Sequence, residues 1–164
     1  MKNKNREEHK VLWAPWRKSY ILKVSKKKGC VFCKAIEERN DKKNLIVKRS
    51  KYGFAILNLY PYNNGHLMVI PNRHVAGFEQ LTDNEMLNIF KLQSEMVALL
   101  KHRLKPHGLN VGVNLGRAAG AGVAGHLHIH IVPRWVGDTN FMPMIGRSKV
   151  ISESLVSLYA RLSE

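Results

Sequence analysis

Three histidines alternate with apolar residues in GHLHIHIVPRW, which covers residues 125–135. Side chains two positions apart in an extended strand share one face of the sheet. His126, His128 and His130 are therefore predicted to line one face, while the apolar residues between them face the core. Imidazoles on one face can bind a metal. Alternatively, one of them can attack an electrophile while its neighbours orient it and hold charge.

The segment before these histidines, GRAAGAGVAG at 116–125, is rich in glycine. It contains G-x-G-x-x-G, but the dinucleotide-binding fingerprint requires that a helix follow the last glycine. The alternating pattern here predicts a strand instead, which excludes that interpretation. Glycines between two strands let backbone N–H groups turn toward an anion, and Arg117 lies in the same loop. Phosphorus is therefore the natural electrophile for a histidine beside this loop.

A second group of possible ligands is the pair Cys30 and Cys33 in KKKGCVFCK. A Cys-x-x-Cys pair is either a redox dithiol or half of a zinc site. Redox pairs start a helix that follows a strand, and KKKG offers no strand, so the sequence favours zinc. An empty pair of thiols is the third interpretation. Zinc requires two further ligands, and histidines can supply nitrogen.

The elements that must position these residues are short strands and a few helices. The fold class that they predict is α+β with a largely antiparallel five-stranded sheet. A short helix is expected at 30–41 and an amphipathic one at about 150–162. The strands are predicted at 44–50, 52–60, 66–71, 109–116 and 126–134.

One long helix is predicted between the third and fourth strands. Thr82 and Glu85 form a capping box at its start, and Lys105 with Pro106 ends it. Its apolar residues recur at helical spacing: Met86, Ile89, Phe90, Val97, Leu100 and Leu104.

Length and charge limit the class of protein. The 164 residues fit a solvated basic tail at 1–10 and a single domain at 11–164. No apolar run suits a membrane helix or a signal core, so we expect a cytoplasmic protein without a membrane partner. The net charge of +15 attracts polyanions, but the lysines are scattered. Nucleic acid is therefore a conceivable partner that the sequence does not favour.

The segment GHLHIHIV resembles the H-φ-H-φ-H-φ-φ signature of the histidine triad superfamily. The resemblance covers most of residues 11–145, through LWAPWR, Cys-x-x-Cys, NNGHLMVIPNRH, NLGRAAGAG and PRWVGDTNFMP. It is most similar to the bacterial branch with diadenosine tetraphosphate phosphorylases and fragile-histidine-triad-like dinucleoside polyphosphate hydrolases. The resemblance implies a histidine triad fold. It also implies cleavage of an adenine dinucleoside polyphosphate through a nucleotidyl-histidine, by phosphorolysis or hydrolysis.

The resemblance also implies roles for individual residues. His128 matches the nucleophile, His130 assists at the phosphate, and His66 supports the nucleophile from the neighbouring strand. The loop at 118–125 departs from many relatives because it has no hydroxyl or amide side chain, which bears on the choice between hydrolysis and phosphorolysis. The nucleotide-binding positions are Asn58 at the ribose, Asn114, Gly120, Ala121 and Gly122 at the phosphates, Trp135 on the substrate side, and Phe32 and Ile56 near the adenosine.

The related zinc-bearing proteins complete the metal site with the residues that match His74 and His126. Together with Cys30 and Cys33 these would form a structural zinc tetrahedron. The resemblance also implies a homodimer. Two alternatives stay open: a nucleoside phosphoramidate or adenylyl-amine hydrolase, and a non-catalytic nucleotide or nucleic-acid binder.

Overall fold

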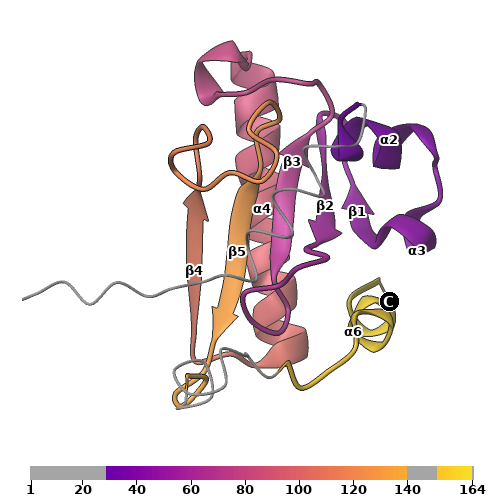
Figure 1. Ribbon diagram of the computed structural model, residues 1–164. Helices are drawn as coiled ribbons and strands as arrows, with labels where there is room; N and C mark the ends of the chain where they lie inside the picture. The colour runs from indigo at the N-terminus through magenta and orange to yellow at the C-terminus, as the bar shows by residue number, and fades with distance from the viewer. Residues whose placement is uncertain (1–28, 140–150, 164) are drawn as a thin grey trace, which may run out of the picture.

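The computed structural model describes residues 29–139 and 151–163 (Figure 1). The expected tail at 1–10, the segment LWAPWR and the end of PRWVGDTNFMP lie outside the described residues, and the division into tail and domain stays a prediction. No helix in the described ranges combines the length and apolar character needed to cross a membrane.

Five strands form one antiparallel sheet, as expected, in the order β1-β2-β3-β5-β4. The hairpin of β1 and β2 turns at Ser50, whose amide donates to the Gly53 carbonyl at 2.8 Å. In the register of the two central strands, Met68 lies opposite His130. The strands are β1 at Ile46–Arg49, β2 at Gly53–Leu57, β3 at Leu67–Pro71, β4 at Gly108–Val113 and β5 at Ile129–Arg134.

The histidine strand is shorter than predicted, because β5 begins only at Ile129. The amide of Leu127 donates to Val75 in the loop after β3, at 2.6 Å, instead of to a neighbouring strand. The amide of His126 closes a turn onto the carbonyl of Val123. His126 and His128 therefore precede the strand and are held by a loop.

The long helix α4 spans Asp83–Leu104, as predicted. Its capping box is formed, with the Thr82 amide donating to the Glu85 carboxylate at 2.8 Å. The residues that α4 buries differ in part from those expected, because Phe90 is half exposed. Ile89 and Leu100 are buried as expected, and Leu92 and Met96 join them.

The other helices are shorter than predicted. The expected helix at 30–41 is divided into α2 at Val31–Glu37 and α3 at Asp41–Asn44, because Arg39 between them has a positive φ of 45°. The last helix, α6, begins at Leu155 and ends at Ser163. A 3-10 turn, η1, covers Phe78–Gln80.

The two faces of the sheet are covered differently. The long helix α4 runs behind the strands, while α2 lies beside β1 and β2 (Figure 1). The α4 face packs Leu57, Val69 and Ile131 of the sheet into one apolar cluster with α4 and α6. The opposite face packs alternate residues of the strands against Phe32 and Ala35 of α2. These residues are Ile46, Phe54, Ile56, Met68 and Ile70.

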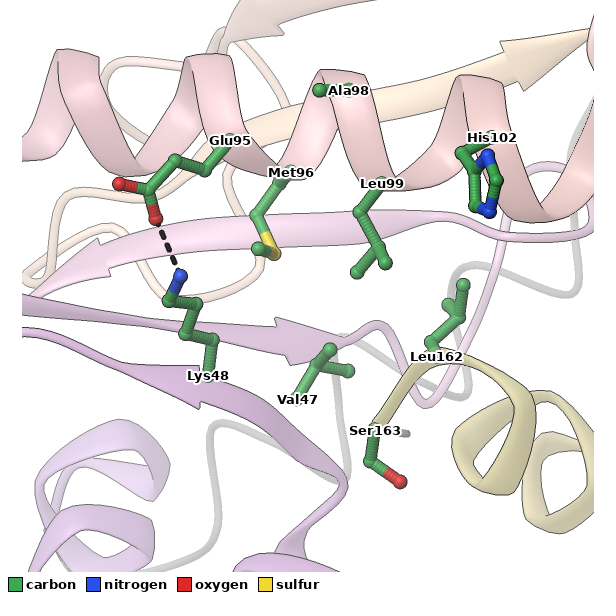
Figure 2. Close-up of a pocket in the computed structure, with 9 residues that line it drawn as sticks. All are labelled: Val47, Lys48, Glu95, Met96, Ala98, Leu99, His102, Leu162 and Ser163. Carbon is green, nitrogen blue, oxygen red and sulfur yellow. Dashed lines mark ion pairs between the residues drawn. The ribbon is translucent and has the colours of Figure 1, made fainter.

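A cavity of about 520 Å³ lies on the α4 side, between β1, α4 and the end of α6 (Figure 2). Val47, Met96 and Leu99 line its apolar part, and the Lys48–Glu95 ion pair at 2.8 Å closes one side. It contains none of the histidines predicted to do chemistry, so it is not the candidate active site.

Candidate active site and metal cluster

The sheet face opposite α4 carries four buried histidines. His66 and His126 are fully buried, His128 is 5% exposed and His130 is 8% exposed. The sequence predicts a core only on the side of the apolar residues, but the structure buries the histidine side as well. Phe32 of α2 lies against His126 and His128, and Tyr62 lies against His66 and His130. Each imidazole therefore sits where burial without a hydrogen bond would be costly.

A hydrogen-bonded relay fixes the protons of two of these rings. The Tyr62 amide donates to Nδ1 of His66 at 3.0 Å, so the His66 proton is on Nε2. That nitrogen lies 2.9 Å from Nδ1 of His130 and donates to it, which leaves the His130 proton on Nε2. Burial, with charge repulsion from His130 and His128, lowers the pKa of His66 to about 3. His66 is therefore neutral at physiological pH.

His128 is held in the opposite tautomer. Its Nδ1 lies 2.8 Å from the backbone carbonyl of His126, and because a carbonyl only accepts, Nδ1 carries the proton. Nε2 then keeps its lone pair. Burial lowers the pKa of His128, which keeps the ring neutral. The ring lies 5.0 Å from that of His130 and 5.5 Å from that of Phe32, between centroids.

The four residues predicted as metal ligands are brought together, with their ligand atoms all within 4.8 Å of one another. Nδ1 of His126 lies 3.3 Å from Sγ of Cys30 and 3.6 Å from Sγ of Cys33, and Nδ1 of His74 lies 3.4 Å from Sγ of Cys33. Metal distances of about 2.3 Å to sulfur and about 2.0 Å to nitrogen give a tetrahedral S–N edge of about 3.5 Å. The cluster therefore fits a tetrahedral metal ion.

The tautomer and the thiols agree with that fit. Nε2 of His126 donates to the Pro71 carbonyl at 2.9 Å, which turns the lone pair of Nδ1 toward the sulfurs. Burial and the neighbouring Cys30 raise the pKa of Cys33 to about 11. A reactive redox thiol has a lowered pKa, so Cys33 lacks this property of a redox cysteine.

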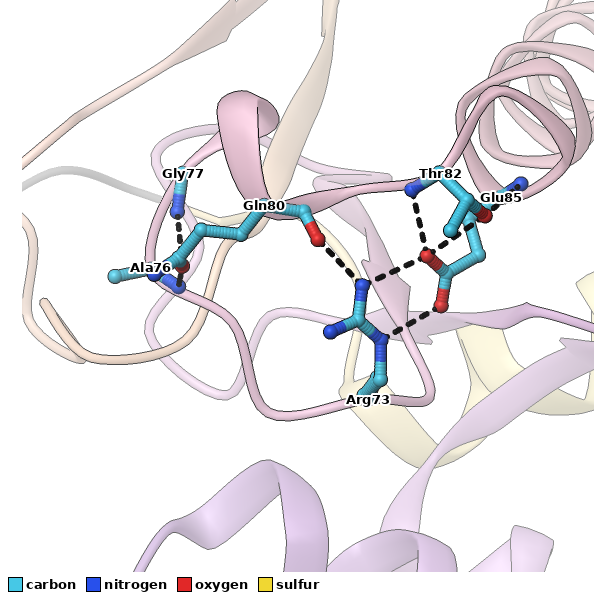
Figure 3. A network of polar contacts seen from close by, with 6 residues as sticks. All are labelled: Arg73, Ala76, Gly77, Gln80, Thr82 and Glu85. Atoms are coloured by element: carbon cyan, nitrogen blue, oxygen red, sulfur yellow. Dashed lines mark hydrogen bonds and ion pairs between the residues drawn. The ribbon is translucent and has the colours of Figure 1, made fainter.

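Arg73, which the sequence did not single out, helps to hold the loop that carries His74 (Figure 3). Nε and one terminal nitrogen of Arg73 donate to the two carboxylate oxygens of Glu85, at 2.9 and 2.8 Å. The same carboxylate caps α4 through Thr82, and Arg73 lowers the pKa of Glu85 to about 2. The network fastens the loop to the start of α4. The capping box identifies Glu85 from the sequence. No sequence pattern identifies its partner Arg73, which lies twelve residues away.

A second network unmarked in the sequence ties the turn before β3 to the end of β5. Nδ2 of Asn63 donates to Asp138 at 2.7 Å and to the Pro133 carbonyl at 2.9 Å. Arg134 donates twice to Asp138 and holds the pKa of that carboxyl well below its usual range. This network fixes the turn from which His66 enters β3.

Some of the predicted nucleotide-binding residues lie beside the histidines, and others do not. Ile56 and Phe32 pack in one cluster on the histidine face, and Nδ2 of Asn58 lies 3.4 Å from Nδ1 of His66. Asn114 is half-buried just after β4. Trp135 follows β5, seven residues or roughly 23 Å of extended chain beyond His128, so it is not part of the histidine cluster.

The glycine-rich loop at 116–125 forms turns with hydrogen bonds inside the loop. Gly116 and Gly120 have positive φ angles of 78° and 90°, a conformation that favours glycine. The amides of Gly120 and Ala121 donate to carbonyls inside the loop, at 3.0 and 3.3 Å, rather than turning toward an anion as expected. Gly122 is half-buried in the same loop.

A buried neutral histidine with a free lone pair, next to a glycine-rich loop, defines a site for group transfer to nitrogen. The comparisons give the family: the HIT domain model matches residues 39–136, and the chain belongs to this family.

Two curated relatives have named activities. The chain is 42% identical to an AP-4-A phosphorylase of Mycobacterium tuberculosis, over 92% of this chain and 80% of the relative. It is 37% identical to a bis(5'-adenosyl)-triphosphatase of Saccharomyces cerevisiae, over 57% of this chain and 47% of the relative. Among solved structures, a hypothetical histidine triad nucleotide-binding protein from Sulfolobus tokodaii matches with a TM-score of 0.67 and 29% identity, over 82% of this chain and 89% of that one.

Proposed function

We propose that the protein is an enzyme that cleaves dinucleoside polyphosphates, such as diadenosine tetraphosphate, through a nucleotidyl group on His128. The observation that carries the proposal is the bond from Nδ1 of His128 to the His126 carbonyl, which leaves Nε2 as the nucleophilic atom. The names of the two relatives, AP-4-A phosphorylase and bis(5'-adenosyl)-triphosphatase, support the same class of substrate.

In the first step, the lone pair of Nε2 of His128 attacks the α-phosphorus. An N–P bond forms, and the P–O bond to the departing nucleoside polyphosphate breaks. Nε2–H of His130 donates to an oxygen of the transferring group and stabilises its charge. The bond from His66 keeps that proton in place, because it occupies the other nitrogen of His130.

In the second step an acceptor attacks the same phosphorus, and the N–P bond returns its electron pair to His128. Water as the acceptor gives AMP and a proton, whereas inorganic phosphate gives ADP. Adenosine packs near Phe32 and Ile56 in this arrangement. Asn58 lies at the ribose, and Asn114 with residues 120–122 lies at the phosphates. Trp135 contacts the substrate at a distance from the reacting phosphorus.

The same proposal includes a structural zinc ion on Cys30, Cys33, His74 and His126. Zinc with four protein ligands has no open position and contributes folding free energy rather than catalysis. Metal analysis of the purified protein tests this, and zinc well below one equivalent per chain would contradict it.

A homodimer formed along β4 completes the proposal. In the described sheet β4 is an edge strand, and Val111 on it is 45% exposed. Such an edge offers unpaired backbone groups to a second copy of the strand. The molar mass in solution tests this: Val111→Lys should shift it toward the monomer, and a monomeric wild type would contradict the inference.

The activity is tested by incubating the protein with diadenosine tetraphosphate, with and without inorganic phosphate, and separating the products. ADP and ATP formed only with phosphate identify a phosphorylase, while AMP and ATP identify a hydrolase. Two molecules of ADP formed without phosphate would require attack at a β-phosphorus and contradict the nucleotidyl-His128 intermediate. His128→Ala should form no product.

The same assay separates the alternatives. Turnover of adenosine phosphoramidate without turnover of the tetraphosphate would identify the phosphoramidate hydrolase. Unchanged nucleotides together with steeply salt-dependent binding of DNA or RNA would identify a nucleic-acid binder.

A further inference from the structure

His126 belongs to two sites at once. Its side chain lies in the metal cluster, with Nδ1 3.3 Å from Sγ of Cys30. Its backbone carbonyl accepts the Nδ1 proton of His128 at 2.8 Å. The position of the His126 side chain therefore helps to fix the carbonyl that selects the tautomer of His128.

Phe32 makes a second connection between the two sites. It lies between the two cysteines in the sequence, on the first turn of α2, and is 6% exposed. Its ring lies 5.5 Å from the ring of His126 and 5.5 Å from that of His128. Cys30 and Cys33 flank it, so the ligands that would hold a metal also set the place of this ring.

The two halves of the cluster differ in how firmly the protein holds them. The loop with His74 is fastened to α4 by the bidentate Arg73–Glu85 pair (Figure 3). Cys30 is the N-cap of α2 and Cys33 lies on its first turn. The helix has seven residues, too few for a helix to be stable by itself. Loss of a metal would therefore act first on the Cys30 end of α2, which carries Phe32 and faces the nucleophile, because Arg49 binds the carbonyls of Ala35 and Ile36 at the other end.

We propose that metal binding at Cys30, Cys33, His74 and His126 is energetically coupled to nucleotide binding at His128, with His126 and Phe32 as positioning residues. The inference rests on the proposed function, because it takes His128 as the place where the nucleotide phosphate binds. Coupling between two sites is reciprocal: a nucleotide that tightens the metal is itself tightened by the metal by the same factor.

The coupling is measured without turnover, on the full chain. The zinc affinity is determined by competition with a chromophoric chelator, with and without saturating AMP. AMP should tighten zinc about fivefold or more, and zinc should tighten AMP by the same factor. Equal affinities in the presence and absence of the other ligand would overturn the proposal, as would a failure of the protein to bind zinc.

The tautomer of His128 shows whether His126 positions this ring or only supports the fold. In long-range ¹H–¹⁵N correlation spectra, zinc-bound protein should show His128 in the Nδ1–H tautomer. Metal-free protein that keeps its circular dichroism should show a mixture of the two tautomers. An unchanged tautomer after metal removal would contradict the role assigned to the His126 carbonyl.

Two variants of α2 test the role of Phe32. Phe32→Ala leaves all four ligands in place, so zinc should still bind while the effect of AMP on its affinity becomes smaller. Val31→Ala alters a 38% exposed neighbour and should leave the coupling factor unchanged. An unchanged coupling factor in Phe32→Ala would show that Phe32 has no part in the coupling.

The outcomes also distinguish this inference from the proposed function. If His128→Ala abolishes turnover and AMP binds independently of zinc, only the coupling fails. If His128→Ala retains full turnover, the proposed function fails, whatever the zinc titration gives.

Discussion

The two faces of the sheet are both buried, but by different chemistry. The α4 face is closed by hydrocarbon from strands and helix, with Leu57, Val69 and Leu100 at its centre. The opposite face buries histidines beside Phe54 and Ile70. Apolar burial stabilises the fold on the first face. On the second face, polar groups are kept buried by hydrogen bonds that also fix their protons.

Residues that stabilise the fold and residues that could do chemistry therefore lie on opposite sides of the same strands. Met68 and His130 pair on one side of β3 and β5, while their neighbours Val69 and Ile131 enter the α4 core. Substitutions on the two faces should therefore separate turnover from stability.

The largest effect is expected on the histidine face. His128→Ala removes the nucleophile, so kcat should fall at least about a thousandfold with the fold retained. Turnover of the tetraphosphate and circular dichroism are the measurements. His102→Ala changes an exposed imidazole on α4 and should leave kcat unchanged. Near-normal turnover in His128→Ala would place the chemistry elsewhere.

A smaller loss is expected when the relay is broken. His66→Ala removes the donor to Nδ1 of His130, so the proton of His130 is no longer confined to Nε2. We expect kcat to fall about a hundredfold. Steady-state kinetics on folded protein measure this, and a change confined to KM would show that His66 serves binding alone.

The α4 face should respond in the opposite way. Leu100 is fully buried there, so Leu100→Ala should reduce the free energy of unfolding by about 2–5 kcal/mol. Denaturation in urea measures the loss, while kcat of the folded fraction should stay close to that of the wild type. A large fall in kcat with unchanged stability would remove the contrast between the faces.

Acid should weaken the fold through the histidine face. The pKa of His66 is lowered to about 3 in the folded chain, and an unfolded histidine titrates near about 6.5. Between these values the unfolded chain binds the extra proton, so stability is complete above the upper value and falls as the pH is lowered. The slope from this residue is at most about 1.4 kcal/mol per pH unit.

Urea unfolding at several pH values, with a chelator present to exclude metal effects, measures this slope. His66→Ala should lower it. An equal slope in wild type and variant would show that another group is responsible.

The smallest effect is expected at the cavity on the α4 side. Lys48 and Glu95 form an ion pair of 2.8 Å there, but both side chains are half exposed (Figure 2). Lys48→Ala should change the free energy of unfolding by less than about 0.5 kcal/mol and leave kcat unchanged. A larger loss of stability would give this ion pair a greater part in the fold.

Much of the fold follows from local sequence patterns. Alternation and turn residues indicate the five strands, and the Thr82 capping box with Lys105 bounds α4. The Arg39 turn that divides the first helix and the loop that precedes β5 were missed. The loop before β5 depends on a contact with a residue distant in the sequence, the bond from Leu127 to Val75. The Arg39 turn rests on a positive φ that no local sequence pattern indicates.

The candidate site divides in the same way. Cys-x-x-Cys and the alternating histidines are visible as patterns, and the resemblance supplied His74 and His66. The Arg73–Glu85 pair and the Asn63–Asp138 bond have no periodic signal, because each joins segments that meet only in the folded chain. The burial of the histidines was missed because Phe32 and Tyr62, which pack against their rings, are placed there by tertiary packing.

The central claim is that His128 carries the nucleotidyl group, and mass spectrometry of a rapidly quenched reaction tests it most directly. After mixing with diadenosine tetraphosphate, the peptide that contains His128 should carry an adenylyl group. The group should disappear as AMP or ADP is released, and it should be absent in His128→Ala. An adenylyl group on another residue, or turnover with none on any peptide at any time, would contradict the account.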